Sequence, residues 1–567
     1  MPTETSFVPT NLNCRDWSNV QPLVDNLLNR EIGDTAALEQ WLLERSDLES
    51  HIYEAYSRLQ VAMTCHTDDK EKAAAFRAFT QDVLPQAKKA GFALDGKYYE
   101  NEHRRGLDRT RYEVFDRNTA VDIELFRDEN VPIETELDGL RQEFQQVVGA
   151  QTVEFQGKTR TMPEMGKFLE APQRETREAA YRAASDRRLV DQDKLRGVFD
   201  TMLEKRQQVA KNAGFDNYRD YMFRRMHRFD YTPEDCARFH DAVAEHVVPL
   251  YRESNERRQA LMEIPTYRPW DLANDPLGRA PLDPFGGDVR AMEEGGQQIF
   301  NLMDEQLGRL YATLRDGDSL DLETRPGKAP GGYQTVFAVS RKPFIFMNAA
   351  GLGRDLRTLL HEAGHAFHTL LGGNDPLLAY RHAPIEFCEV ASMSMELTAI
   401  PYLNTVYKNP EDESRAVRVQ LEGVIRLLPW VAQIDAFQHW IYTHPGHTAA
   451  EREQTWLALD ERFGPSIDWT GLEDYRRESW QRQLHLFSYP FYYIEYGIAQ
   501  LGALQVWMKH RQHAGDAIDS YKAALSLGGS RPLPELFEAA GIRFAFGGDT
   551  IRELANEVRA ALHEIPD

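Results

Sequence analysis

Apolar side chains recur at three- and four-residue spacing along most of this chain, a period that places them on one face of an α-helix. One example is the set Leu137, Leu140, Phe144 and Val147. The pattern runs over residues 16–201, continues over 198–262 and dominates again after residue 353. No internal repeat of solenoid length accompanies it. The chain is therefore predicted to be mainly α.

Two short segments carry strand patterns instead. Residues 152–161 alternate apolar and polar side chains around Gln156-Gly157, which predicts a hairpin. Residues 331–337 and 342–348 are rich in aromatic and β-branched side chains, so a small sheet is expected just before residue 361. The edge of this sheet at residues 344–348 is either a place where an extended peptide adds as a strand or part of a plain structural hairpin.

The length of the chain indicates more than one lobe. At 567 residues it exceeds the size at which a single hydrophobic core keeps growing. We place an N-terminal helical lobe at residues 1–197 and a second region at 198–567. Proline and glycine concentrate in residues 265–287, which predicts a loop or a connection there.

Composition excludes several classes of partner. The formal net charge is −23 and no basic run is present, so a nucleic-acid partner is not expected. No stretch approaches the ~20 apolar residues of a membrane helix, and the polar start lacks the features of a signal peptide. Four scattered cysteines without a C-x-x-C pair favour a reducing compartment. We expect a soluble, cytoplasmic protein without a membrane partner, and the sequence indicates no oligomeric state.

One motif carries specific chemistry. Residues 361–365 read His-Glu-Ala-Gly-His and match H-E-x-x-H, in which two imidazoles one helical turn apart share a metal ion and the glutamate acts as base. His361 and His365 are therefore candidate ligands of one Zn²⁺ ion per chain, and Glu362 is the candidate base. Gly364 weakens a helix by about 1 kcal/mol relative to alanine, which indicates that another backbone comes close there.

A catalytic zinc site needs a third protein ligand. Residues 384–400 are predicted to form a helix that carries Glu386, Glu389 and Glu396 on one face. Spacing prefers none of the three decisively, although Glu389 is our choice, and the other two would orient imidazole N–H groups. His368 is the remaining rival, and we interpret it as a neighbour of the ligands because a carboxylate is the commoner third ligand of this motif.

Residues 485–497 are dense in tyrosine. In the helix expected after Pro490, Tyr493 and Tyr496 share one face. An aromatic stripe of this kind is ordinarily core packing, but hydroxyl-bearing rings also supply the donors that stabilise an oxyanion. The residues alone leave both interpretations open.

With these residues in hand, the chain resembles the oligoendopeptidase F and thimet oligopeptidase family of zinc metallopeptidases, and it is more similar to the oligoendopeptidase F branch. The resemblance is firm from about residue 200 to the end. Six segments carry it: residues 268–272 (RPWDL), 343–348 (PFIFMN), 361–368 (HEAGHAFH), 387–392 (FCEVAS), 485–496 (HLFSYPFYYIEY) and 525–530 (LSLGGS).

The resemblance implies a fold and a set of roles. The expected fold consists of two mostly helical lobes around a deep substrate channel that admits short peptides. A small sheet is expected beside the H-E-x-x-H helix. The family's third zinc ligand corresponds to Glu389, and its general base corresponds to Glu362. The groups that contact the scissile carbonyl correspond to His485 and to Tyr489, Tyr493 and Tyr496.

The expected function is therefore zinc-dependent hydrolysis of internal bonds in short peptides. Zinc-bound water would be the nucleophile, with the tyrosines and His485 as oxyanion donors. One alternative is a zinc carboxypeptidase, which needs a cationic group for the terminal carboxylate of its substrate. Another is a peptide-binding protein whose site has lost catalysis.

Overall fold

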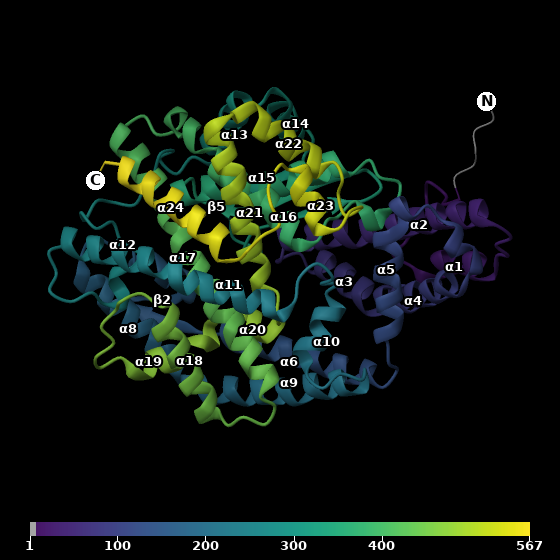
Figure 1. Cartoon of the computed structure of the whole chain (residues 1–567), viewed down its shortest axis with the longest axis horizontal. Coiled ribbons are helices and arrows are strands. Elements are labelled where there is room, and N and C mark those ends of the chain that lie inside the picture. The colour runs from purple at the N-terminus through teal and green to yellow at the C-terminus, as the bar shows by residue number, and fades with distance from the viewer. Residues whose placement is uncertain (1–6, 567) are drawn as a thin grey trace. The chain divides into compact units, whose positions relative to one another are not determined.

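The computed structural model describes residues 7–566 and confirms the mainly helical class (Figure 1). The chain divides into two compact units, each built from separate stretches of sequence. Unit 1 comprises Met1–Glu124, Asp283–Glu413 and Gly502–Phe544, and unit 2 comprises Leu125–Leu282, Ser414–Leu501 and Ala545–Asp567. The division at residue 198, and the substrate channel between two lobes, stay predictions.

Unit 1 holds the N-terminal helices, a three-stranded sheet and the helices that follow it. Its helices are α1 (Trp17–Asn29), α2 (Thr35–Cys65), α3 (Lys70–Ala78), α4 (Leu84–Glu100), α5 (Arg109–Leu125), α13 (Val289–Met303), α14 (Glu305–Asp316), α15 (Gly353–Gly372), α16 (Ile385–Thr398), α22 (Ala514–Leu525) and α23 (Leu533–Ala539). Its strands are β3 (Leu320–Glu323), β4 (Tyr333–Phe337) and β5 (Lys342–Ala349). Short 3-10 or π-helical segments are η1 (Phe79–Val83), η2 (Glu102–Gly106), η4 (Leu378–Tyr380) and η5 (Ile400–Thr405).

Unit 2 is helical apart from one hairpin. Its helices are α6 (Asn130–Gly149), α7 (Met162–Phe168), α8 (Arg174–Val190), α9 (Gln192–Asn212), α10 (Tyr218–Arg225), α11 (Pro233–His246), α12 (Val248–Leu261), α18 (Ala449–Phe463), α19 (Glu473–Arg477), α20 (Leu484–Ser488) and α24 (Gly548–Glu564). The hairpin is β1 (Thr152–Phe155) with β2 (Lys158–Thr161), and 3-10 segments are η3 (Pro269–Asp271) and η6 (Ser479–Arg482). Helices α17 (Pro410–Thr443) and α21 (Tyr493–Gln512) contain residues of both units, and Leu125 at the end of α5 already belongs to unit 2.

The predicted hairpin at residues 152–161 is confirmed. Strands β1 and β2 pair antiparallel, with Phe155 opposite Lys158. The two residues between them, Gln156 and Gly157, have φ of 51° and 73°. Positive φ at both positions is what a two-residue turn needs to match the twist of its strands.

The sheet of unit 1 confirms the two predicted strands and adds one that was not predicted. Its strand order is β3-β5-β4, and β5 runs parallel to β3 and antiparallel to β4. The proposal that a peptide adds to the edge of residues 344–348 is wrong, because β5 is the central strand and both of its edges are paired. Strand β4, which follows Gly331 and Gly332, lies at an edge instead.

The helix that carries the H-E-x-x-H motif lies directly after this sheet. Helix α15 contacts β5, α13, α14 and α16, and its apolar stripe of Leu356, Leu360, Ala363 and Phe367 is buried (Figure 1). Its first turn is closed by Asp355, whose carboxylate accepts hydrogen bonds from the N–H groups of Ala350 at 2.7 Å and Leu352 at 3.1 Å. A negative group at this end also complements the helix dipole. The motif is thus held on a packed helix within one unit.

None of the helices within residues 7–566 combines the length and apolarity that a membrane span requires. The four cysteines all lie in this range, and none of them forms a disulfide.

Candidate metal centre

The backbones of α15 and α16 approach each other at Gly364. A Cβ atom placed on Gly364 would lie 2.6 Å from the carbonyl oxygen of Ala391 and 2.6 Å from Cα of Ser392, both in α16. Real Cβ atoms essentially never come this close to another backbone. The prediction that a second backbone comes close at Gly364 is confirmed, and this contact sets the spacing between the two helices.

Three candidate ligands converge across this contact. The ligand atoms of His361, His365 and Glu389 all lie within 4.8 Å of one another. Oε2 of Glu389 is 3.4 Å from Nε2 of His361 and 3.7 Å from Nε2 of His365. The hydroxyl of Ser392 donates to the same Oε2 at 3.0 Å. Two imidazoles and one carboxylate form a donor set that suits zinc and leaves a coordination position for water or substrate.

Hydrogen bonds outside this set orient both imidazoles. Nδ1 of His361 donates to Oε1 of Glu396 at 2.7 Å, and the ring of His365 bonds to the backbone of Cys388. Such partners fix the tautomer and the ring orientation of a metal-binding histidine. Of the three carboxylates that spacing left open, Glu389 lies in the ligand set and Glu396 orients His361. Glu386 is buried outside the set.

Burial and neighbouring charge tune the ionisable groups. Burial raises the pKa of Glu362 to about 7, and the charges of Glu389 and Glu396 add to the effect. Burial alone would lower the pKa of His361, but its hydrogen bond and the charge of Glu396 outweigh this and raise it to about 9. Burial holds the pKa of His365 well below its usual value. The raised pKa of His361 favours its protonated form, and a cation bound at this centre would displace that proton.

His368 lies outside the ligand set. It is buried, burial lowers its pKa to about 3, and its ring meets that of Phe387 edge-on with centroids 6.1 Å apart. Its Nε2 has no hydrogen-bond partner within the described part of the chain. His368 is therefore a neutral ring packed beside the candidate centre.

The remaining predicted residues gather in unit 2. His485 lies on α20, Tyr489 follows that helix, and Tyr493 and Tyr496 lie at the start of α21. The ring centroid of His485 is 4.8 Å from that of Tyr493, 5.9 Å from that of Tyr496 and 6.1 Å from that of Tyr489. Tyr489 is half exposed, at 52%. These four rings form one aromatic group within their own unit.

A chain of hydrogen bonds that was not predicted from the sequence determines which ring nitrogen of His485 carries the proton. The indole of Trp430 donates to Oε1 of Gln483 at 3.2 Å, and the amide nitrogen of Gln483 lies 2.8 Å from Nδ1 of His485. Because an indole N–H can only donate, the amide must present its nitrogen to the histidine. Nδ1 then accepts, and the proton of the neutral ring is on Nε2. Burial lowers the pKa of His485 to about 4, so the ring is a neutral donor at neutral pH.

A family model matches most of this chain. The model of peptidase family M3 matches residues 167–278 and 297–556, which is more than half of the chain. The chain belongs to peptidase family M3. M3 peptidases are metallopeptidases, and the matched residues include the H-E-x-x-H motif, Glu389 and the aromatic group around His485.

Individual proteins and solved structures are also similar to this chain. The oligoendopeptidase F homolog of Borreliella burgdorferi is 26% identical over 292 residues, which cover 48% of this chain and 47% of that protein. Oligopeptidase PepF of Bacillus subtilis is 24% identical over 401 residues, which cover 66% of this chain and 55% of that protein. The chain thus matches about half the length of these curated relatives. The structure of PZ peptidase A with an inhibitor superposes with a TM-score of 0.90 at 25% identity, over 99% of both chains.

Proposed function

We propose that this chain is a zinc-dependent endopeptidase that hydrolyses internal bonds of short peptides. The convergence of two imidazoles and a carboxylate on α15 and α16, beside a buried glutamate, carries the proposal. Membership of an M3 metallopeptidase family supports peptide hydrolysis, and the names of the oligopeptidase relatives support short peptides as substrates. The proposed location is the cytoplasm, because cysteines that form no disulfide favour a reducing compartment.

Each residue of the centre receives a role. His361, His365 and Glu389 would hold one zinc ion, with Glu396 keeping the His361 ring in place. Bound zinc supplies Lewis acidity, which polarises the scissile carbonyl and acidifies water. Glu362 takes a proton from the attacking water and passes it to the leaving amine. A pKa raised toward neutrality suits a group that must both accept and return a proton.

The aromatic group would stabilise the negative charge that develops on the carbonyl oxygen. The neutral His485 ring offers its Nε2–H, and the hydroxyls of Tyr489, Tyr493 and Tyr496 offer O–H donors. Donors that are already oriented are worth more than water because they need not reorganise during the reaction. The chain from Trp430 through Gln483 supports this role, since it keeps the His485 proton on the donating nitrogen.

The test is the Glu362→Gln variant. It keeps the shape of the side chain but removes the base, so we expect full zinc content and a loss of about 10²–10⁴-fold in kcat. Glu305→Gln makes the same chemical change at an exposed position on α14 and should leave activity intact. Zinc is measured by mass spectrometry and turnover by an internally quenched peptide. A Glu362→Gln enzyme with normal turnover would refute the mechanism.

The choice of substrate separates the alternatives. A quenched peptide with an amidated C-terminus offers no terminal carboxylate, so a strict carboxypeptidase cannot cleave it, whereas an endopeptidase should. A zinc-loaded chain that binds peptides without cleaving any member of a mixed library would instead favour the non-catalytic alternative.

A further inference from the structure

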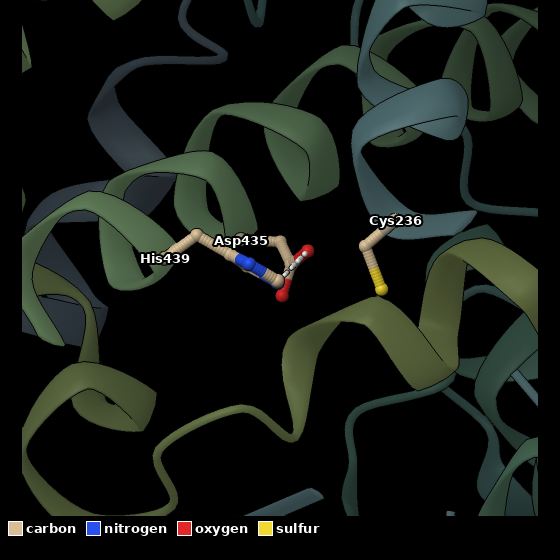
Figure 2. Close-up of side chains that lie close together, drawn as sticks. All are labelled: Cys236, Asp435 and His439. Carbon is tan, nitrogen blue, oxygen red and sulfur yellow. Dashed lines mark ion pairs between the residues drawn. The ribbon is translucent and has the colours of Figure 1, made fainter. Parts of the chain in front are cut away.

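A second group of metal-binding side chains lies in unit 2, apart from the residues assigned above. Cys236 comes from α11, and Asp435 and His439 come from successive turns of α17 (Figure 2). Their sulfur, oxygen and nitrogen atoms all lie within 4.8 Å of one another. Cys236 and Asp435 are completely buried, whereas 14% of the His439 side chain is exposed. The group thus lies in the interior of unit 2, and only part of the His439 side chain is exposed.

The hydrogen bonds of Asp435 leave part of this group unsatisfied. Its Oδ2 accepts a hydrogen bond from Nε2 of His240 at 2.8 Å. Its Oδ1 has no hydrogen-bond partner among the described residues, although the side chain is 0% exposed. Nε2 of His439 lies 3.3 Å from Oδ2, at ion-pair distance. A buried polar atom without a partner costs about 1–3 kcal/mol, and more when it is charged.

We propose that Cys236, Asp435 and His439 bind a zinc ion that is distinct from the one at His361 and His365. A sulfur, a nitrogen and an oxygen donor suit zinc, whereas calcium and magnesium require oxygen ligands. The cation would bind Oδ1, which has no hydrogen-bond partner among the described residues, together with the imidazole nitrogen of His439.

The geometry needs only a small adjustment to hold the ion. In a tetrahedral site, zinc bonds of about 2.3 Å to sulfur and 2.0 Å to nitrogen hold those two atoms about 3.5 Å apart. Because the three ligand atoms already lie within 4.8 Å of one another, side-chain movements that total at most about 1.3 Å bring them to that distance. His240 stays outside the ligand set, and its hydrogen bond to Oδ2 holds the Asp435 carboxylate in place, as outer partners of metal ligands do.

The position of the site indicates a structural role. Zinc would link α11 to α17 within unit 2. The His439 ring packs edge-on against Phe491 at a centroid distance of 5.5 Å, and Gln438 accepts a hydrogen bond from the N–H of Phe491 at 2.6 Å. Phe491 lies in the segment that leads into the tyrosines of α21. A bound ion would thus fix the α17 side chains that anchor this segment. The site does not depend on the proposed peptidase activity.

Cobalt provides a specific probe, because only this site contains a thiol. The substitutions His361→Ala and His365→Ala remove both imidazoles of the first centre. The full-length chain that carries both substitutions is then loaded with Co²⁺. We expect one cobalt per chain, together with a near-ultraviolet thiolate-to-cobalt charge-transfer band. Zinc analysis should give two ions per chain for the unmodified protein and one for this variant.

Adding Cys236→Ser to that background should abolish the band, whereas Cys14→Ser, at a buried thiol in unit 1, should leave it unchanged. If the Cys236→Ser protein does not fold, the spectrum of the variant that carries only His361→Ala and His365→Ala still shows whether a thiolate binds cobalt. Absence of cobalt from that variant, or bound cobalt without a thiolate band, would overturn the proposal and leave Asp435 as a carboxylate paired only with histidines.

Discussion

Replacing Gly364 with alanine tests whether the close contact between α15 and α16 builds the metal centre. The added Cβ would lie 2.6 Å from two backbone atoms of α16, against 3.4 Å for the lower end of ordinary contact, so the helices must separate by about 0.8 Å. Backbone atoms cannot rotate out of the way as a side chain can. His365 follows Gly364 directly on α15, and Glu389 lies two and three residues before the contacted residues on α16, so separating the helices moves His365 away from Glu389.

The expected magnitude follows from this displacement. Metal–ligand distances tolerate only about 0.2 Å, and a misplacement of about 1 Å costs about 10²-fold in catalysis. We therefore expect Gly364→Ala to weaken zinc binding at least tenfold and to lower kcat/KM by about 10²-fold. Overpacking should also destabilise the fold by about 1–3 kcal/mol, partly offset by about 1 kcal/mol of helix propensity.

Gly91→Ala provides the matched control. Gly91 lies inside α4 in the same unit, and nothing lies within 4 Å of the Cβ it would gain. This variant should gain about 1 kcal/mol of helix propensity and bind zinc normally. Zinc affinity is measured by competition with a chromophoric chelator, and stability by denaturant unfolding. A Gly364→Ala protein with unchanged affinity and activity would show that the contact does not set the ligand geometry.

Three further predictions concern side chains around the two units. Glu396→Gln replaces the acceptor of the His361 N–H, so zinc should bind about 10–100-fold more weakly in a chelator competition, while the fold persists. Asp271→Asn leaves the buried guanidinium of Arg177 without its carboxylate, so unfolding free energy should fall by about 3–5 kcal/mol, and an unchanged value would contradict that assignment. His485→Gln should lower kcat without moving the acid limb of the pH–rate profile, because burial lowers the pKa of His485 to about 4 and the ring is already neutral across that limb.

The helices around the candidate centre could be predicted because their chemistry is local. The i, i+4 spacing of His361 and His365 requires a helix, and the glutamate spacing of residues 384–400 requires another. Gly364 indicated a close backbone contact, and the structure shows that the contact is made by α16. The predicted range 384–400 agrees with α16 to within two residues, and α15 begins at Gly353, where the helical pattern resumes.

The sheet was predicted less completely because its pairing is not local. Strand β3 has only four residues, Leu320–Glu323, which is too short for a periodic pattern. It pairs in parallel with β5, so the partner lies beyond β4 in the chain and no turn residue marks the pairing. This additional strand is also the reason that β5 lies at the centre of the sheet and not at its edge.

The chain of hydrogen bonds behind His485 shows a different limit. The sequence pattern selects His485 because it lies among tyrosines, but its value as a donor depends on which ring nitrogen carries the proton. Gln483 fixes that proton on Nε2 only because Trp430, 53 residues earlier in the chain, fixes the amide. Gln483 is only two residues from His485, but Trp430 has no spacing relationship to it that a motif could capture. The identity of a site residue can therefore be inferred from the sequence, whereas its protonation state follows from the fold that surrounds it.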